Sequence, residues 1–263
     1  MPREAAAGED ERMVGRRAVE ASGMPAGDAR LPLLYRTLAP IAVERHSRLH
    51  MRTEGNFDFA SGLNAVPLTV DELPQAMHSY PIVLTTGAMP MPVALVGFER
   101  GRNDHVDPNG AWTPGAYVPA YLRRYPFFLL KESKDSNRKV LCADFTSTFF
   151  SEEPGAGTAL FEGGKPSERL SAMLGFCNRL ETAMARTRAV MAETSRLGLI
   201  GPATVTVVRG GRSLQVEGFS VVAEERVRAL PDATRADLAR RGVLGLYSAQ
   251  QFSTVHFLGS GML

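Results

Sequence analysis

The pattern of apolar and polar positions in the middle of the chain predicts two short helices, each followed at once by a buried strand. Pro74–Leu84 and Pro119–Leu129 match position by position, through either a duplication or, given the shortness of the match, two independent uses of one local pattern. The leading proline of each segment fits the first helical turn, where its missing N–H costs nothing. Tyr80 and Tyr125 each precede a further proline, which disfavours the α conformation and ends the helix. The apolar run after each Tyr-Pro pair is typical of a buried strand.

Other strands are predicted on both sides of these units. They are expected at His46–Arg52, Pro92–Phe98, His105–Val106, Lys139–Asp144, Thr204–Val208, Leu214–Glu217 and Phe219–Val222. A turn at Arg209–Arg212, with two central glycines, makes a hairpin of the strands beside it. Residues 151–166 are rich in glycine and proline and are predicted to form a loop.

The strongest helical pattern follows Ser167, a residue type that favours the N-cap position. Its apolar residues are spaced three and four apart, at Leu170, Met173, Leu174, Cys177, Leu180, Met184 and Met191. Gly198 ends this helix, and Pro231–Thr234 introduces a last amphipathic helix before residues 244–258 close the chain. The fold class is therefore α+β, with one mixed or mostly antiparallel sheet and flanking helices.

The N-terminal residues differ in composition from the rest of the chain. Residues 1–30 alternate Ala, Gly, Glu, Asp and Arg with few large apolar side chains, which predicts a disordered tail. Residues 31–263 are expected to form a single α+β domain.

Composition and charge exclude several functional classes. The 263 residues carry 30 Lys+Arg against 28 Asp+Glu, and this near-neutral balance argues against a nucleic-acid partner. No apolar run is long enough to span a bilayer, so no transmembrane segment is predicted. The N-terminus lacks the apolar core of a signal peptide, so a soluble cytoplasmic protein is expected, with leaderless export left open. The glycine-rich stretches lack phosphate-binding spacing, and no cofactor is predicted.

Two groups of polar residues could suggest metal or acid–base chemistry. His46 and His50 have the spacing of metal ligands on a helix, but the pattern there favours a strand and no carboxylate partner is evident, so no metal site is predicted. Asn103–Asp107 groups one histidine with two carboxylates, which suits either an acid–base pair or a polar turn. We favour the turn, with the aspartates accepting backbone N–H groups. Cys142 and Cys177 are far apart in the sequence and are expected to be buried thiols.

The most interesting polar cluster lies around the second Tyr-Pro pair. Arginine clamps carboxylates and aromatic faces stack on rings, so this region is a candidate site for an anion or a sugar. The candidate ligand-binding residues are Asp107, Trp112, Arg123, Arg124 and Tyr125. Against this, adjacent arginines cannot face the same way on a helix, and structural roles are the favoured alternative.

A series of short motifs resembles the bacterial SapC family. The motifs are Asn64–Leu68, Tyr80–Val83, Pro92–Leu95, Asp107–Trp112 and Tyr117–Phe127. The resemblance extends from about residue 35 to residue 257. One departure is Ser248–Gln251, where the family tends toward a Tyr-Ala-His-like stretch.

The resemblance implies a role rather than a mechanism. The family is associated with bacterial surface layers, and its genes often lie near those of TonB-dependent receptors and tryptophan-halogenase-like flavoproteins. We therefore expect a soluble, non-catalytic binding or assembly protein of surface-layer or nutrient-uptake systems, with a protein partner in the cell envelope. The alternative is an enzyme for a small polar or anionic substrate, in which Asp107, Arg123, Arg124 and Tyr125 converge in one cleft.

Overall fold

The fold is α+β, as predicted, but its strands form several sheets instead of one. The computed structural model describes residues 31–52, 56–132, 138–209 and 211–258. The tail predicted at residues 1–30 lies outside the described residues. The strands in the described ranges form four separate sheets, and every pairing is antiparallel.

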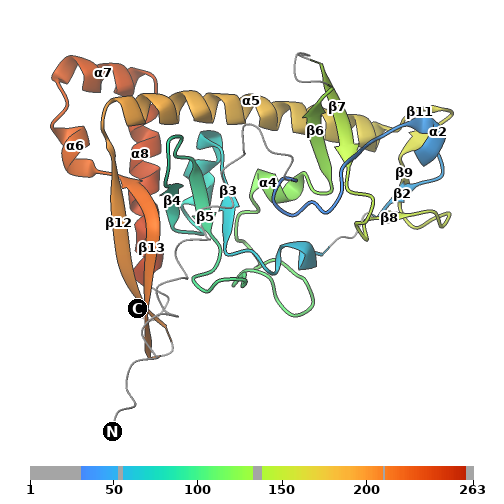
Figure 1. The fold of residues 1–263 in the computed structure, drawn as a ribbon, viewed down its shortest axis with the longest axis horizontal. Coiled ribbons are helices and arrows are strands. Elements are labelled where there is room, and N and C mark those ends of the chain that lie inside the picture. The colour runs from blue at the N-terminus through green and yellow to red at the C-terminus, as the bar shows by residue number, and fades with distance from the viewer. Residues whose placement is uncertain (1–30, 53–55, 133–137, 210, 259–263) are drawn as a thin grey trace, which may run out of the picture.

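The largest sheet has five strands in the order β12-β13-β4-β5-β3. Their bounds are β3 (Ala65–Pro67), β4 (Ile82–Thr85), β5 (Pro92–Leu95), β12 (Ile200–Arg209) and β13 (Arg212–Val222). All four residues of β4 are buried, which agrees with the predicted interior strand. The β12–β13 hairpin is also confirmed and projects from the rest of the molecule (Figure 1).

Three smaller sheets lie toward the other end of the molecule (Figure 1). One contains β1 (Ala39–Pro40), β7 (Lys139–Ala143) and β6 (Phe127–Lys131), in that order. The second contains β8 (Phe150–Ser151), β2 (His50–Met51) and β9 (Thr158–Ala159). The third pairs β10 (Phe161–Glu162) with β11 (Lys165–Pro166). The loop predicted at residues 151–166 was therefore wrong in part, because short strands pair within it.

The prediction of a strand starting at His46 was also wrong for the first half of that segment. His46 is the last residue of helix α2 (Val43–His46), and only His50–Met51 are extended. The reason is a local hydrogen bond that the apolar pattern does not reveal. The N–H of Ala42, at the start of the helix, donates to Nδ1 of His46 at 3.0 Å. This bond satisfies an N-terminal N–H that would otherwise lack a partner.

The two Tyr-Pro units have the predicted local structure but enter different sheets. Helix α3 (Leu73–Ala76) leads into β4, and helix α4 (Ala120–Arg123) leads into β6. Pro74 lies in the first turn of α3, as predicted, whereas Pro119 is the N-cap of α4. β4 and β6 do not pair with each other.

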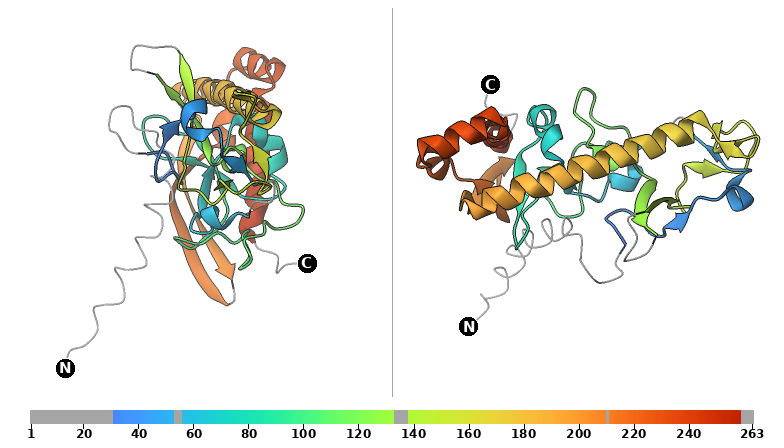
Figure 2. Two further views of the ribbon diagram at one scale, coloured as in Figure 1. Left: turned by 90° about the vertical axis from the view of Figure 1, so that its right-hand side faces the viewer. Right: turned by 90° about the horizontal axis from the view of Figure 1, so that it is seen from above.

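Helix α5 (Glu168–Arg196) crosses the molecule from end to end (Figures 1 and 2). Ser167 Oγ accepts the N–H of Leu170 at 3.4 Å, and Gly198 follows the helix at a φ of +67°. Its N-terminal half packs among the phenylalanines of the small sheets, and its C-terminal half packs on the core beneath the large sheet. None of the helices in the described ranges is both long and apolar enough to cross a bilayer.

The packed face of α5 differs from the predicted one at three positions. Leu174, expected to pack, is exposed, whereas Thr187 and Thr194 are fully buried. Each threonine hydroxyl donates to the carbonyl four residues earlier, which satisfies the polar atom inside the core. The Thr187 hydroxyl also accepts the N–H of Val70 at 2.9 Å. The apolar pattern did not predict the burial of these two threonines, because threonine does not contribute to an apolar stripe.

A buried carboxylate joins the two Tyr-Pro units. Glu72 ends the short 3-10 helix η3 (Val70–Glu72) and is 6% exposed. It accepts hydrogen bonds from the N–H and hydroxyl of Thr69, at 2.8 and 2.9 Å. It also accepts the N–H of Ala120 at 2.7 Å and the hydroxyl of Tyr117 at 3.1 Å. These bonds fix the start of α4 against η3.

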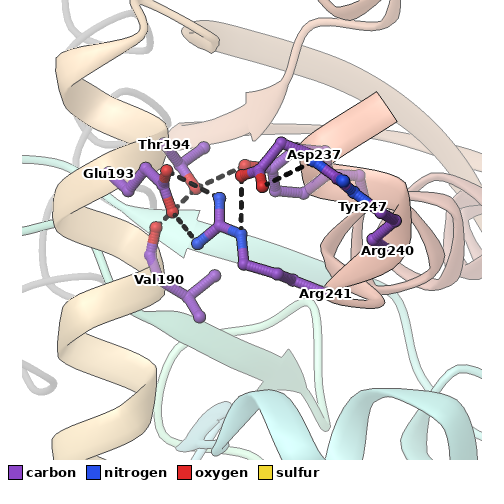
Figure 3. Close-up of polar contacts among 7 residues, drawn as sticks. All are labelled: Val190, Glu193, Thr194, Asp237, Arg240, Arg241 and Tyr247. Carbon is purple, nitrogen blue, oxygen red and sulfur yellow. Dashed lines mark hydrogen bonds and ion pairs between the residues drawn. The ribbon is translucent and has the colours of Figure 1, made fainter. Parts of the chain in front are cut away.

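The C-terminal helices are attached to α5 by a polar network (Figure 3). These helices are α6 (Glu224–Arg228), α7 (Asp232–Arg240), α8 (Val243–Phe252) and the 3-10 helix η4 (Ser253–Leu258). Arg241 donates two hydrogen bonds to Glu193, at 2.8 and 2.9 Å, and its Nε lies 2.9 Å from Asp237. The bond from Arg241 lowers the pKa of Glu193. The charges are paired with one another, and the network therefore acts as a structural link.

Gln250 of α8 completes the large sheet where two of its strands separate. The pairing of β13 with β4 ends at Ser220 and Leu84. Beyond that point the Gln250 side chain accepts the N–H of Val222 at 3.1 Å and donates to the carbonyl of Ile82 at 2.9 Å. Gln250 is 2% exposed and belongs to the stretch that departs from the SapC pattern.

Replacing Gln250 is expected to destabilise the protein because two buried backbone groups lose their partners. We predict that Gln250→Ala lowers the free energy of unfolding by about 3 kcal/mol. Urea denaturation followed by circular dichroism measures this change. Gln251→Ala, one position along and partly exposed, is the matched control and should change stability by less than about 0.5 kcal/mol. Equal effects of the two substitutions would contradict the assignment.

Candidate functional site

The candidate residues predicted from the sequence have different surroundings in the structure. Asp107 is exposed and accepts the N–H groups of Asn109 and Ala111, both at 2.8 Å. This is the backbone-bonded turn that we favoured. Trp112 is buried in the main core, where its Nε1 donates to the Tyr80 hydroxyl at 3.2 Å.

The two adjacent arginines point to different environments. Arg123 is exposed and donates to the Tyr117 hydroxyl at 3.0 Å, and burial together with Glu72 raises the pKa of Tyr117 to about 12. Arg124 is buried, with its guanidinium carbon 4.2 Å from the Tyr121 ring centroid and 4.0 Å from that of Phe128. Arg124 is therefore an internal cation sandwiched between aromatic rings.

The charge on Arg124 has one carboxylate beside it. Glu181 Oε1 lies 3.9 Å from Arg124 Nη1, and the same side chain pairs with Lys139 at 2.9 Å. Arg124 Nε is buried and has no hydrogen-bond partner among the described residues. Nothing about this position gives a ligand access to the guanidinium.

Tyr125 borders an open pocket of about 570 Å³. We call it the Tyr125 pocket and define it by its lining residues: Leu34, Arg36, Asn56, Asp58, Phe59, Tyr125, Thr146, Ser147, Thr148 and Phe149. The Phe59 and Tyr125 rings stack with centroids 4.3 Å apart, and Phe149 meets both of them edge-on. Of the five candidates, Tyr125 lines this pocket.

The polar lining of the Tyr125 pocket combines hydroxyl groups with one cation and one anion. Arg36 is exposed, and no carboxylate in the described ranges forms an ion pair with it. Asp58 accepts a hydrogen bond from the side chain of Asn56. The segment Thr146–Thr148 adds three hydroxyl groups. A small molecule with an acidic group, hydroxyls and a flat face matches this lining.

Asp144 holds the hydroxyl segment and Arg36 in place. Its carboxylate is fully buried and accepts the N–H and hydroxyl of Thr146, at 3.0 and 2.6 Å. It also accepts the N–H of Arg36 at 2.6 Å and the hydroxyl of Thr37 at 3.0 Å. Burial by itself would raise the pKa of Asp144, but these hydrogen bonds lower it below its ordinary value.

The predicted turn at Asp107 supports the opposite wall of the pocket. Gly110, its last residue, has a φ of +77° and lies against Asn56 and Asp58. A Cβ at this position would be 2.5 Å from Asp58 Oδ1 and 2.7 Å from Asn56 Cβ. The Phe57 N–H also donates to the Gly110 carbonyl at 2.7 Å. Only glycine allows the turn to approach the wall this closely.

Leu34 lies in the pocket wall in a strained conformation. Its φ is +82°, in a turn where the N–H of Tyr35 bonds to the carbonyl of Pro32 at 3.2 Å. Glycine is usual at this turn position, and a side chain there costs about 1 kcal/mol or more. Strain of this kind tends to occur at ligand sites.

Neither the two cysteines nor His46 lines the Tyr125 pocket. Cys142 and Cys177 are both free and buried, as predicted, and burial raises the pKa of Cys177 to about 11. The His46 ring stacks on Phe145 with centroids 4.1 Å apart. In the described ranges, no three His, Cys, Asp or Glu side chains are grouped closely enough to hold a metal ion.

Most of the Tyr125 pocket was missed at the sequence level because its walls come from distant segments. Arg36 and Asp144 are 108 residues apart and meet only in the folded chain. One local signal was available. The run Asp144-Phe-Thr-Ser-Thr148 follows a predicted strand with an acid two residues before a threonine, a pattern typical of a side-chain-bonded turn.

Removing the Asp144 charge is expected to make stability less dependent on pH. The pKa of Asp144 is lower in the folded chain than in the unfolded chain, so its contribution is present above the unfolded pKa and is lost as the pH falls through the folded value. We predict that Asp144→Asn lowers the free energy of unfolding by about 2 kcal/mol at pH 7, and that the difference shrinks below about pH 4. Urea denaturation at several pH values tests this.

The control for this experiment is Asp232→Asn, because the Asp232 side chain is 93% exposed. It should have little effect at any pH. A loss of stability in Asp144→Asn that stays constant down to pH 2 would contradict the role given to the carboxylate charge.

Comparison with known proteins places the chain in a family. Searches of curated proteins and of solved structures each found no match. The model of the SapC family matches residues 41–258, which is most of the chain and includes most of the Tyr125 pocket. The chain therefore belongs to the SapC family.

Proposed function

We propose that this chain is a non-catalytic binding protein that holds a small anionic, hydroxyl-bearing molecule in the Tyr125 pocket. The observation that carries the proposal is the stacked pair Phe59 and Tyr125 in one pocket with Arg36, which forms no ion pair with a carboxylate in the described part of the chain. Aromatic faces bind flat or ring-shaped groups, and guanidinium binds carboxylate or phosphate oxygens in a fixed geometry. Asp58 on the rim favours ligand groups that donate hydrogen bonds, such as hydroxyls.

The bonding of Asp144 and the burial of Cys177 argue against a catalytic role for these two side chains. A general base needs a free lone pair within reach of the substrate. Asp144 already uses its oxygens to hold Thr146, Arg36 and Thr37. The raised pKa of Cys177 keeps it a neutral thiol, which is a poor nucleophile.

Membership of the SapC family supports a role in surface-layer or nutrient-uptake systems. In this proposal the chain works with a protein partner of the cell envelope, and the pocket holds the molecule that the system handles. Ligand binding and partner binding are separate properties and can be tested separately.

The first test uses D-glucuronate as the probe because it combines a ring face, hydroxyls and a carboxylate. We expect saturable binding to the full chain by NMR titration, and weaker binding of neutral D-glucose. Arg36→Ala should raise the dissociation constant for glucuronate about tenfold or more, because it removes a charge-assisted hydrogen bond. Arg123→Ala removes an exposed arginine that does not line the pocket and should leave binding unchanged.

Two outcomes would contradict this assignment. One is the absence of saturable binding for both sugars, and the other is an equal effect of the two arginine substitutions. Conversion of the probe into a product during the titration would favour the enzymatic alternative.

The second test concerns the partner. Affinity capture with the tagged full chain, from envelope and cytosolic fractions of the native cells, should recover a protein identified by mass spectrometry that is absent from a tag-only control. Recovery of no specific protein from either fraction would count against the assembly role.

A further inference from the structure

Strand β12 forms a free edge of the large sheet. Among the described strands it pairs with β13 alone. The tip of the hairpin that it forms with β13 extends beyond the other described elements (Figures 1 and 2). In an antiparallel ladder every second residue directs its N–H and C=O away from the partner strand. An edge strand therefore offers a row of hydrogen-bonding groups to another chain.

The part of this edge nearest the body is protected against such pairing. Arg226 of α6 donates to the carbonyls of Gly198 and Ile200, at 3.0 and 2.9 Å. Pro202 has no N–H to offer, and the pairing with β13 is irregular between Ala203 and Val205. A side-chain cover and a proline are devices by which proteins block edge-to-edge association.

The outer part of the same edge has none of these devices. Thr204–Val208 reads Thr-Val-Thr-Val-Val, without charge, proline or glycine. Val208 is 63% exposed, whereas Val207 is fully buried in a core cluster that includes Phe257 of η4. The segment is thus held in an extended conformation by its inner side chains, while no described strand pairs with its outer edge. A preformed strand of this kind loses little conformational entropy when it pairs.

We propose that β12 pairs antiparallel with β12 of a second copy of this chain, about a two-fold axis at Thr206. In this register Val205 faces Val207 of the other copy, and Thr204 faces Val208. Thr204–Val208 contains no charged residue, so no like charges meet within this stretch. An uncharged strand of β-branched residues is complementary to itself, and two-fold symmetry is the commonest form of association. The two five-stranded sheets become one continuous sheet.

A charge-swap experiment tests this pairing directly. The full chain is expected to sediment as a dimer of twice the 28.5 kDa chain mass at protein concentrations between about 1 and 200 µM. Thr206→Lys and Thr206→Glu each place like charges opposite one another at the axis, and each should raise the dimer dissociation constant at least about tenfold. An equimolar mixture of the two variants should restore the dimer, because opposite charges then meet.

Thr182→Lys, on the exposed face of α5, is the control for added charge and should dimerise as the native chain does. Circular dichroism of each variant establishes that the hairpin and the helices are still folded. A native chain that stays monomeric throughout this range overturns the proposal. So does a dimer that neither Thr206 substitution weakens, since the contact then lies elsewhere, and so does a failure of the mixture to recover the dimer.

Discussion

The interaction on which the rest of the arrangement depends is the burial of the Glu72 carboxylate, which forms no ion pair with a lysine or arginine of the described ranges. Its negative charge is balanced by the N–H and hydroxyl of Thr69, the hydroxyl of Tyr117 and the N–H of Ala120. A charge inside a protein is tolerated only when hydrogen bonds replace the water it has lost. If the two segments that supply these bonds separated, the buried carboxylate would lose hydrogen bonds that replace its lost water. The contact between η3 and α4 is therefore effectively fixed.

That fixed contact determines where the candidate site lies. α4 begins at Ala120 and is one turn long, so the residues after it leave in a set direction. Arg124 enters the apolar interior between two rings, and Tyr125 stacks on Phe59. The Asp144 carboxylate fixes the facing wall through Thr146 and Arg36. The Glu72 contact thus positions the start of the segment that carries Tyr125, and Asp144 positions the facing wall of the pocket.

Local features of the fold were predictable from the sequence, and features that depend on distant contacts were not. The Tyr-Pro end of α4, the Gly-Gly hairpin and the Ser167 cap depend on residues next to one another, and all three are present, whereas α3 ends at Ala76, before its Tyr-Pro pair. The division into separate sheets depends on which strands meet, which no local pattern encodes. Gln250 shows the same limit. A glutamine in a helix is normally expected to face solvent, and its buried role is evident only once the two strands that it bridges are known.

The length of α5 has a consequence for how this family can vary. Leu170 and Cys177, in the N-terminal half of this helix, pack with the small sheets. Met191, in its C-terminal half, packs in the core cluster that includes residues of the large sheet. Inserting a single residue between them would turn one half by about 100° relative to the other and shift it by about 1.5 Å. Both halves could not then keep their partners. Relatives that keep both packing regions should therefore keep the number of residues between Cys177 and Met191, because a seven-residue change restores the rotation but shifts one half by about 10 Å.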